Sequence, residues 1–70
     1  MTEPARIDAR GLRCPWPALR LARALRNGLL PVEILADDPA AEREIRALAA
    51  ARGTSIEVFE IDGGPAFRIG

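Results

Sequence analysis

Cys14 is the side chain of this sequence with the greatest potential for chemistry. It follows Arg13 and precedes two alternating prolines, Pro15 and Pro17, after which apolar residues recur with helical spacing. Proline is tolerated in the first turn of a helix, because the backbone N–H groups there have no intrahelical acceptor. We therefore expect Pro15 and Pro17 in the first turn and Cys14 at or next to the N-cap. The helix dipole, the unpaired N–H groups and Arg13 then favour a thiolate, with a pKa of about 3.5–7.5.

A lone cysteine is also commonly a small buried hydrophobic residue, so the spacing alone leaves both interpretations open. The chain has one cysteine and no histidine or lysine. This composition excludes a Cys-His pair, a Cys-x-x-Cys couple, a zinc-ligand set and a lysine-bearing phosphate loop within the chain. We therefore expect no metal and no cofactor. A thiolate at a helix start, in a domain too small to enclose a substrate pocket, suits a residue that accepts a group and hands it on.

The length and composition limit the class of protein. Seventy residues predict one small domain spanning 1–70, with 1–5 as a loose lead-in, and the 49% hydrophobic content is typical of a folded chain. Ten arginines balance ten acidic residues, which gives no electrostatic basis for direct nucleic-acid binding. No apolar run approaches the roughly 20 residues that span a bilayer, so we expect no membrane insertion. A single unpaired cysteine predicts a reducing compartment, the cytoplasm.

The apolar periodicity predicts two helices and four strands. They are, in chain order, a strand at 6–9, a helix at 15–26, a strand at 31–36, a helix at 39–51, and strands at 54–61 and 65–69 joined by a turn at 62–64. Asp38 is expected to be the N-cap of the second helix and Pro39 its first residue, which accounts for the pair of aspartates by capping. The order β-α-β-α-β-β predicts an α/β two-layer sandwich, with both helices on one face of a four-stranded mixed sheet.

A second candidate group lies on one flank of the first helix. Arg20, Arg23 and Arg26 are three residues apart, and Trp16 and Leu19 lie near them. One interpretation is a solvated face whose cations interact with the negative end of the helix dipole. The other is a docking edge for an acidic partner, because exposed tryptophan and arginine are typical of interface hot spots.

Residues 8–17 (DARGLRCPWP), followed by an amphipathic helix, resemble the TusA/SirA-like family with its Cys-Pro-x-Pro motif. Residues 34–41 (ILADDPAA), followed by Glu44 and Ile45, resemble the second landmark of that family. The similarity extends from about Ile7 to Ile69. It implies a two-layer sandwich similar to the C-terminal domain of translation initiation factor three. It also implies that Cys14 accepts sulfane sulfur as a persulfide and passes it to a partner protein.

The same resemblance assigns supporting roles. It implies that Pro15 and Pro17 set the helix start, that Arg13 assists electrostatically, and that Asp38 lies near the partner surface. Trp16 occupies the variable motif position, where an acidic residue is common. The implied partners are a sulfur donor, either a cysteine desulfurase or a rhodanese, and an acceptor protein. The implied activity is that of a sulfurtransferase-type carrier rather than a stand-alone turnover enzyme, in tRNA thiolation, molybdenum-cofactor assembly, sulfur oxidation or selenium handling.

Two other functions stay open at the level of sequence. A non-catalytic, protein-binding regulatory or adaptor module would use Trp16 and the arginine edge, including Arg23, without covalent chemistry. RNA contact is suggested by the initiation-factor-like fold alone, which is a weak argument for function, and the zero net charge argues against it.

Overall fold

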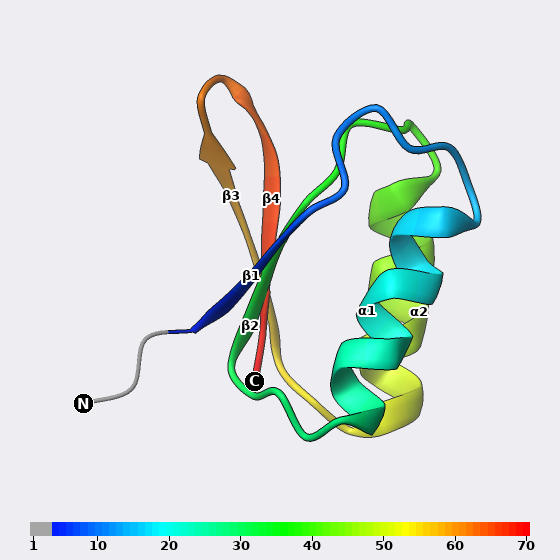
Figure 1. The fold of residues 1–70 in the computed structure, drawn as a ribbon, viewed down its shortest axis with the longest axis vertical. Coiled ribbons are helices and arrows are strands. Elements are labelled where there is room, and N and C mark those ends of the chain that lie inside the picture. The colour runs from blue at the N-terminus through cyan, green and yellow to red at the C-terminus, as the bar shows by residue number, and fades with distance from the viewer. Residues whose placement is uncertain (1–3) are drawn as a thin grey trace.

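Two helices lie side by side on one face of a four-stranded sheet, and the other face of the sheet is uncovered (Figure 1). The structure is a computed structural model that describes residues 4–70. Its elements are β1 (Ala5–Asp8), α1 (Trp16–Arg26), β2 (Val32–Leu35), α2 (Ala41–Arg52), β3 (Ile56–Ile61) and β4 (Gly64–Ile69). The predicted order and two-layer architecture are confirmed. The predicted lead-in ends earlier than expected, because Ala5 already belongs to β1, and residues 1–3 lie outside the described part of the chain.

The strands are ordered β1-β2-β4-β3, with β1 parallel to β2 and the other two pairs antiparallel. The parallel pair requires a crossover, which α1 provides, and α2 carries the chain from β2 to the far edge at β3. A two-residue turn then joins β3 to β4. Its residues Asp62 and Gly63 have φ values of 53° and 76°, the left-handed pair that matches the twist of a hairpin.

The core lies between the helices and the sheet. Its largest fully buried side chains include Leu21 of α1, Ile45 of α2 and Phe67 of β4. Small residues on both helices, Ala24 of α1 and Ala49 of α2, are buried beside them. The apolar face of α1 packs on the sheet through Leu21, Ala24 and Leu25, and residues on the opposite flank are exposed.

The uncovered face of the sheet carries a row of alternating charges. Arg6, Glu33, Arg68 and Glu57 are in register across all four strands. Glu33 is only 5% exposed, and its two carboxylate oxygens accept hydrogen bonds from Arg6 at 3.1 Å and from Arg68 at 2.8 Å. The bond from Arg6 lowers the pKa of Glu33; burial opposes this effect, and the contacts with Arg68 reinforce it.

Candidate functional site

Cys14 is exposed in the loop between β1 and α1, directly before Pro15, which is the N-cap of α1. Pro17 lies in the first helical turn, so the prediction that the two prolines mark the helix start is confirmed with Pro15 one position before it. The preceding loop bends at Gly11, whose φ of +83° is in the left-handed region that favours glycine. Leu12 then packs against the core and fixes the loop on the body of the protein.

A salt bridge orders the first half of this loop. The guanidinium of Arg10 donates hydrogen bonds of 2.9 Å and 2.8 Å to the two carboxylate oxygens of Asp8. These bonds lower the pKa of Asp8 to about 2. The carboxylate that ends β1 is therefore ionised at any physiological pH, and it holds the chain in the bend that leads toward Cys14.

Two consecutive aspartates tie the Cys14 loop to the connection between β2 and α2, and the two loops lie together at one end of the molecule (Figure 1). Asp37 Oδ1 accepts a hydrogen bond of 3.0 Å from the Gly11 N–H. Asp38 Oδ2 accepts one of 3.3 Å from the Cys14 N–H, while its Oδ1 accepts one of 2.8 Å from the Ala40 N–H. Each aspartate thus binds a backbone donor of the thiol-bearing loop.

This arrangement corrects the predicted start of the second helix. The N-cap of α2 is Ala40, not Asp38, and the helix begins at Ala41, two residues after Pro39. Asp38 instead closes a turn across Pro39 and Ala40, because its carbonyl accepts the Ala41 N–H at 2.9 Å and its carboxylate accepts the Ala40 N–H. The capping interpretation of Asp38 was wrong, because its carboxylate binds the N–H groups of Cys14 and Ala40, neither of which belongs to α2.

The thiol of Cys14 faces a carboxylate. Its Sγ donates a hydrogen bond of 2.6 Å to Oε2 of Glu44, a residue in the first turn of α2. The other carboxylate oxygen, Oε1, is buried and has no hydrogen-bond partner within the described residues. The site therefore pairs the exposed Cys14 thiol with a carboxylate of α2 that can accept its proton.

The predicted thiolate is contradicted by this geometry. The hydrogen bond to Glu44 raises the pKa of Cys14 above its ordinary value, and burial and the negative charges of Glu44 and Asp38 raise it further. The cation that opposes this rise is Arg43 of α2, not Arg13 as predicted. The thiol lies at the helix start as expected, but the carboxylates of Glu44 and Asp38 raise its pKa instead of lowering it.

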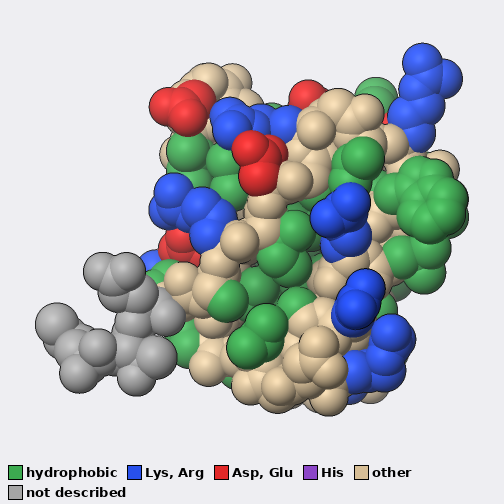
Figure 2. All heavy atoms as spheres, in the orientation of Figure 1, with side chains coloured by type: hydrophobic (Ala, Val, Ile, Leu, Met, Phe, Trp, Pro, Cys, Tyr) green, Lys and Arg blue, Asp and Glu red, His purple; other side chains and the backbone are tan. Residues whose placement is uncertain are grey.

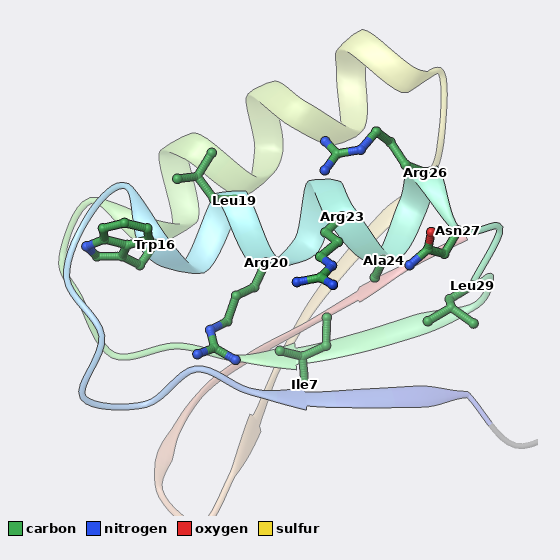
Figure 3. A pocket seen from close by; sticks show the side chains of 9 residues that line it. All are labelled: Ile7, Trp16, Leu19, Arg20, Arg23, Ala24, Arg26, Asn27 and Leu29. Atoms are coloured by element: carbon green, nitrogen blue, oxygen red, sulfur yellow. The ribbon is translucent and has the colours of Figure 1, made fainter.

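A groove runs between α1 and β1. We define the α1–β1 groove by Ile7, Trp16, Arg20, Arg23, Arg26 and Leu29, and its volume is about 550 Å³ (Figure 3). Trp16 and Leu19 are 58% and 50% exposed, so the indole lies largely in solvent. Figure 2 shows a row of basic side chains over α1, with no acidic side chain between them on that face.

Known proteins resemble this chain over most of its length. The model of the family described as Sulfurtransferase TusA matches residues 5–69. The chain belongs to the TusA family. It is 41% identical over 56 residues to an Archaeoglobus fulgidus protein named "Putative sulfur carrier protein", a match that covers 77% of this chain and 73% of that protein. It also resembles the crystal structure of the SirA-like protein from Desulfitobacterium hafniense, with a TM-score of 0.79, 27% identity, and coverage of 94% and 96% of the two chains.

Within this TusA-family chain, the structure brings together some of the predicted site residues and separates others. Cys14, Pro15 and Asp38 converge at the thiol, whereas Arg23 and Arg26 lie farther along α1 and belong to the groove. Trp16 lines the groove and follows Cys14 by two residues in the chain. The thiol itself contacts Glu44 of α2, whereas the groove lies between α1 and β1.

Three residues near the thiol received no role from the sequence. Glu44 and Arg43 act on the Cys14 thiol, and Asp37 holds its loop. Glu44 lies 30 positions from Cys14, so only the packing of α2 beside α1 brings the two together. The available signal was the second landmark of the family, which includes Asp37 and is followed by Glu44.

The described residues contain no set of three or more histidine, cysteine, aspartate or glutamate side chains placed to hold a metal ion. Between residues 4 and 70, neither helix has the length and apolar character needed to cross a bilayer.

Proposed function

We propose that Cys14 accepts a sulfane sulfur as a persulfide and hands it to a partner protein. The observation that carries this proposal is the exposed Cys14 Sγ, held 2.6 Å from the carboxylate of Glu44. Membership of the TusA family, whose relatives include a protein named as a sulfur carrier, supports the transfer of sulfur rather than another group.

In the loading step, the Cys14 sulfur attacks the outer sulfur of a persulfide on the donor, a cysteine desulfurase or a rhodanese. The new S–S bond forms as the donor's S–S bond breaks, and the electron pair of that bond leaves on the donor's cysteine as a thiolate. The thiol proton of Cys14 passes to Glu44 Oε2, the acceptor already in contact with it. Neutral thiol, carboxylate and donor persulfide become Cys14 persulfide, carboxylic acid and donor thiolate.

In the delivery step, a nucleophile of the acceptor protein attacks the outer sulfur of the Cys14 persulfide. Cys14 is now the leaving group and departs as a thiolate. A proton on Glu44 neutralises it, which restores the hydrogen-bonded thiol seen in the structure. The raised pKa of Cys14 favours this return, because a thiolate beside a carboxylate recaptures a proton readily.

The exposure of the thiol also supports a carrier. Cys14 lies in an open loop, and the α1–β1 groove is open to solvent, so a partner's cysteine can approach without a rearrangement of the core. An unpaired, exposed thiol keeps this chemistry only where disulfides are reduced, which supports the cytoplasm as its compartment. A carrier must dock on its donor and its acceptor, so the exposed Trp16 fits this function without a separate adaptor role.

Cyanolysis tests the proposal, because cyanide removes sulfane sulfur as free thiocyanate. A sulfenic acid or an ordinary disulfide releases no thiocyanate. The chain is exposed to polysulfide, freed of excess reagent and treated with cyanide. We expect one thiocyanate per chain and a restored Cys14 thiol, and none from Cys14→Ser. Thiocyanate release that is equal in the two proteins, or absent in both, would contradict the proposal.

A further inference from the structure

We propose that the α1–β1 groove binds an acidic segment with flanking apolar side chains, carried by the protein that exchanges sulfur with Cys14. The assignment of this segment to a sulfur-exchanging partner rests on the proposed function. The chemistry of the groove does not, because it follows from the side chains that line it.

The positive side chains of the groove favour a negatively charged ligand. Arg6, Arg10, Arg46 and Arg68 each form an ion pair with a carboxylate. Within residues 4–70, no carboxylate lies at ion-pair distance from Arg20, Arg23 or Arg26. All three line the groove, and Figure 3 shows Arg20 and Arg23 extending toward β1 while the Arg26 side chain turns away from it. In a chain of zero net charge, Arg20 and Arg23 therefore bring to the groove positive charge that no described carboxylate pairs.

The apolar side chains of the groove select the kind of anion. Figure 3 shows Trp16 at one end and Leu29 at the other, with the Arg20 and Arg23 side chains extending between them toward Ile7 on β1. Trp16 and Leu29 are 58% and 44% exposed, so the groove offers apolar as well as charged side chains to a ligand. Tryptophan and arginine together are typical of protein interfaces. The combination favours a peptide that alternates carboxylates with apolar side chains over a polynucleotide backbone, which offers no aliphatic group to Ile7 or Leu29.

The position of the groove suits an extended segment. β1 is at the edge of the sheet, so one side of its backbone is unpaired within the described residues. Extended peptides bind such edges through main-chain hydrogen bonds, while side chains on alternate positions give specificity. Because Trp16 follows Cys14 by two residues, a segment lying along the groove would direct the adjoining part of its protein to the thiol.

Trp16 provides the readout. It is the only tryptophan, and the chain has no tyrosine, so its fluorescence reports on one end of the groove. The probe is a peptide of about eight residues that alternates glutamate and valine, which when extended spans about 26 Å. The longest dimension of the protein is 29 Å. All titrations use the Cys14→Ser background, so their outcome is independent of whether Cys14 carries sulfur.

Arg23→Glu is the test variant and Arg52→Glu is its matched control. Both substitutions change the net charge equally, and both replace a basic residue in the last turn of a helix, α1 in one case and α2 in the other. Only Arg23 lines the groove. Arg23→Ala is tested as well, and circular dichroism establishes that each variant is folded.

We expect the glutamate–valine peptide to change the Trp16 fluorescence saturably. Arg23→Glu should weaken this binding about tenfold and Arg23→Ala less, while Arg52→Glu should leave it within about twofold. The same peptide with glutamine in place of glutamate should bind more weakly than the acidic one. The proposal is overturned if the acidic peptide gives no saturable change, if Arg52→Glu weakens binding as much as Arg23→Glu, or if a single-stranded RNA of eight nucleotides binds more tightly than the peptide.

Discussion

Cys14 Sγ and Glu44 Oε2 lie 2.6 Å apart although 30 positions separate the two residues in the chain. The thiol comes from the loop before α1 and the carboxylate from the first turn of α2, so the contact exists only when the two helices pack side by side. This contact raises the pKa of the thiol and places a proton acceptor beside the sulfur. The carboxylate that acts on Cys14 thus belongs to the second helix rather than to the helix that the cysteine precedes.

Glu44→Gln should lower the pKa of Cys14. The substitution removes the charge that disfavours the thiolate, while its amide oxygen can still accept a hydrogen bond. The pH profile of alkylation by iodoacetamide should move to lower pH, and the rate near pH 8 should rise several-fold, because more of the thiol is ionised there. Glu42→Gln, in the same helical turn, should leave the profile in place. A profile that stays unchanged or moves to higher pH in Glu44→Gln would show that the carboxylate does not act on the thiol.

Asp38→Asn should free the backbone at Cys14. Asp38 uses one oxygen for the Ala40 N–H and the other for the Cys14 N–H, and asparagine has only one acceptor oxygen. We expect faster hydrogen exchange at the Cys14 amide and a loss of about 1 kcal/mol in the free energy of unfolding. Asp37→Asn is the control: Asp37 accepts only the Gly11 N–H, so one oxygen suffices and the Gly11 amide should stay protected. Equal protection of the Cys14 amide in wild type and Asp38→Asn would refute the contact.

Glu33 should make the fold sensitive to acid. Its pKa is lowered in the folded state, so its contribution to stability is complete above the ordinary glutamate value of 4.5 and is lost as the pH falls through the lowered value. Glu33→Gln should cost about 1 kcal/mol near pH 7, because the arginine partners are partly exposed and solvent screens them. Urea unfolding should show this difference shrinking at about pH 3. Glu57→Gln, in register beside Arg68 but exposed, should have a smaller effect at both pH values.

Leu21 and Trp16 lie on the same helix, but substitutions at the two positions should affect the free energy of unfolding differently. Leu21 is fully buried, and Leu21→Ala should lower the free energy of unfolding by about 2–5 kcal/mol through lost burial and a residual cavity. Trp16 is 58% exposed, and Trp16→Ala should change that energy by less than about 1 kcal/mol. Chemical denaturation of both variants measures the contrast. A large loss of stability in Trp16→Ala would mean that the indole holds the core edge rather than serving the groove.

Local patterns were sufficient for the fold and for the place of the thiol. The alternation of apolar residues gave the strands, and the prolines around Cys14 marked the start of α1 to within one residue. The Asp62-Gly63 turn followed from the left-handed conformations that glycine and aspartate tolerate. These features depend on residues that are close together in the chain, so they can be predicted from one sequence.

The electrostatics of the thiol depend on residues that are distant in sequence. Helix-start position alone favoured a thiolate, but the structure places Glu44 and Asp38 beside Cys14 and reverses the direction of the pKa shift. The pair Asp37-Asp38 was interpreted as a cap because no local pattern indicates that the Cys14 loop lies against it. Composition offered a docking edge on α1 only as one of two interpretations, and the groove depends on β1 and Leu29, which lie outside that helix.

The most direct test of the account is intact-protein mass spectrometry of the chain, without reductant, after incubation with a cysteine desulfurase and cysteine, or with polysulfide. Cys14→Ser is treated in parallel. The account predicts a gain of one sulfur mass that reductant reverses and that the variant lacks, and the added sulfur should leave when an acceptor thiol is supplied. A Cys14 that stays unmodified under every donor, or a mass gain that persists in Cys14→Ser, would contradict it.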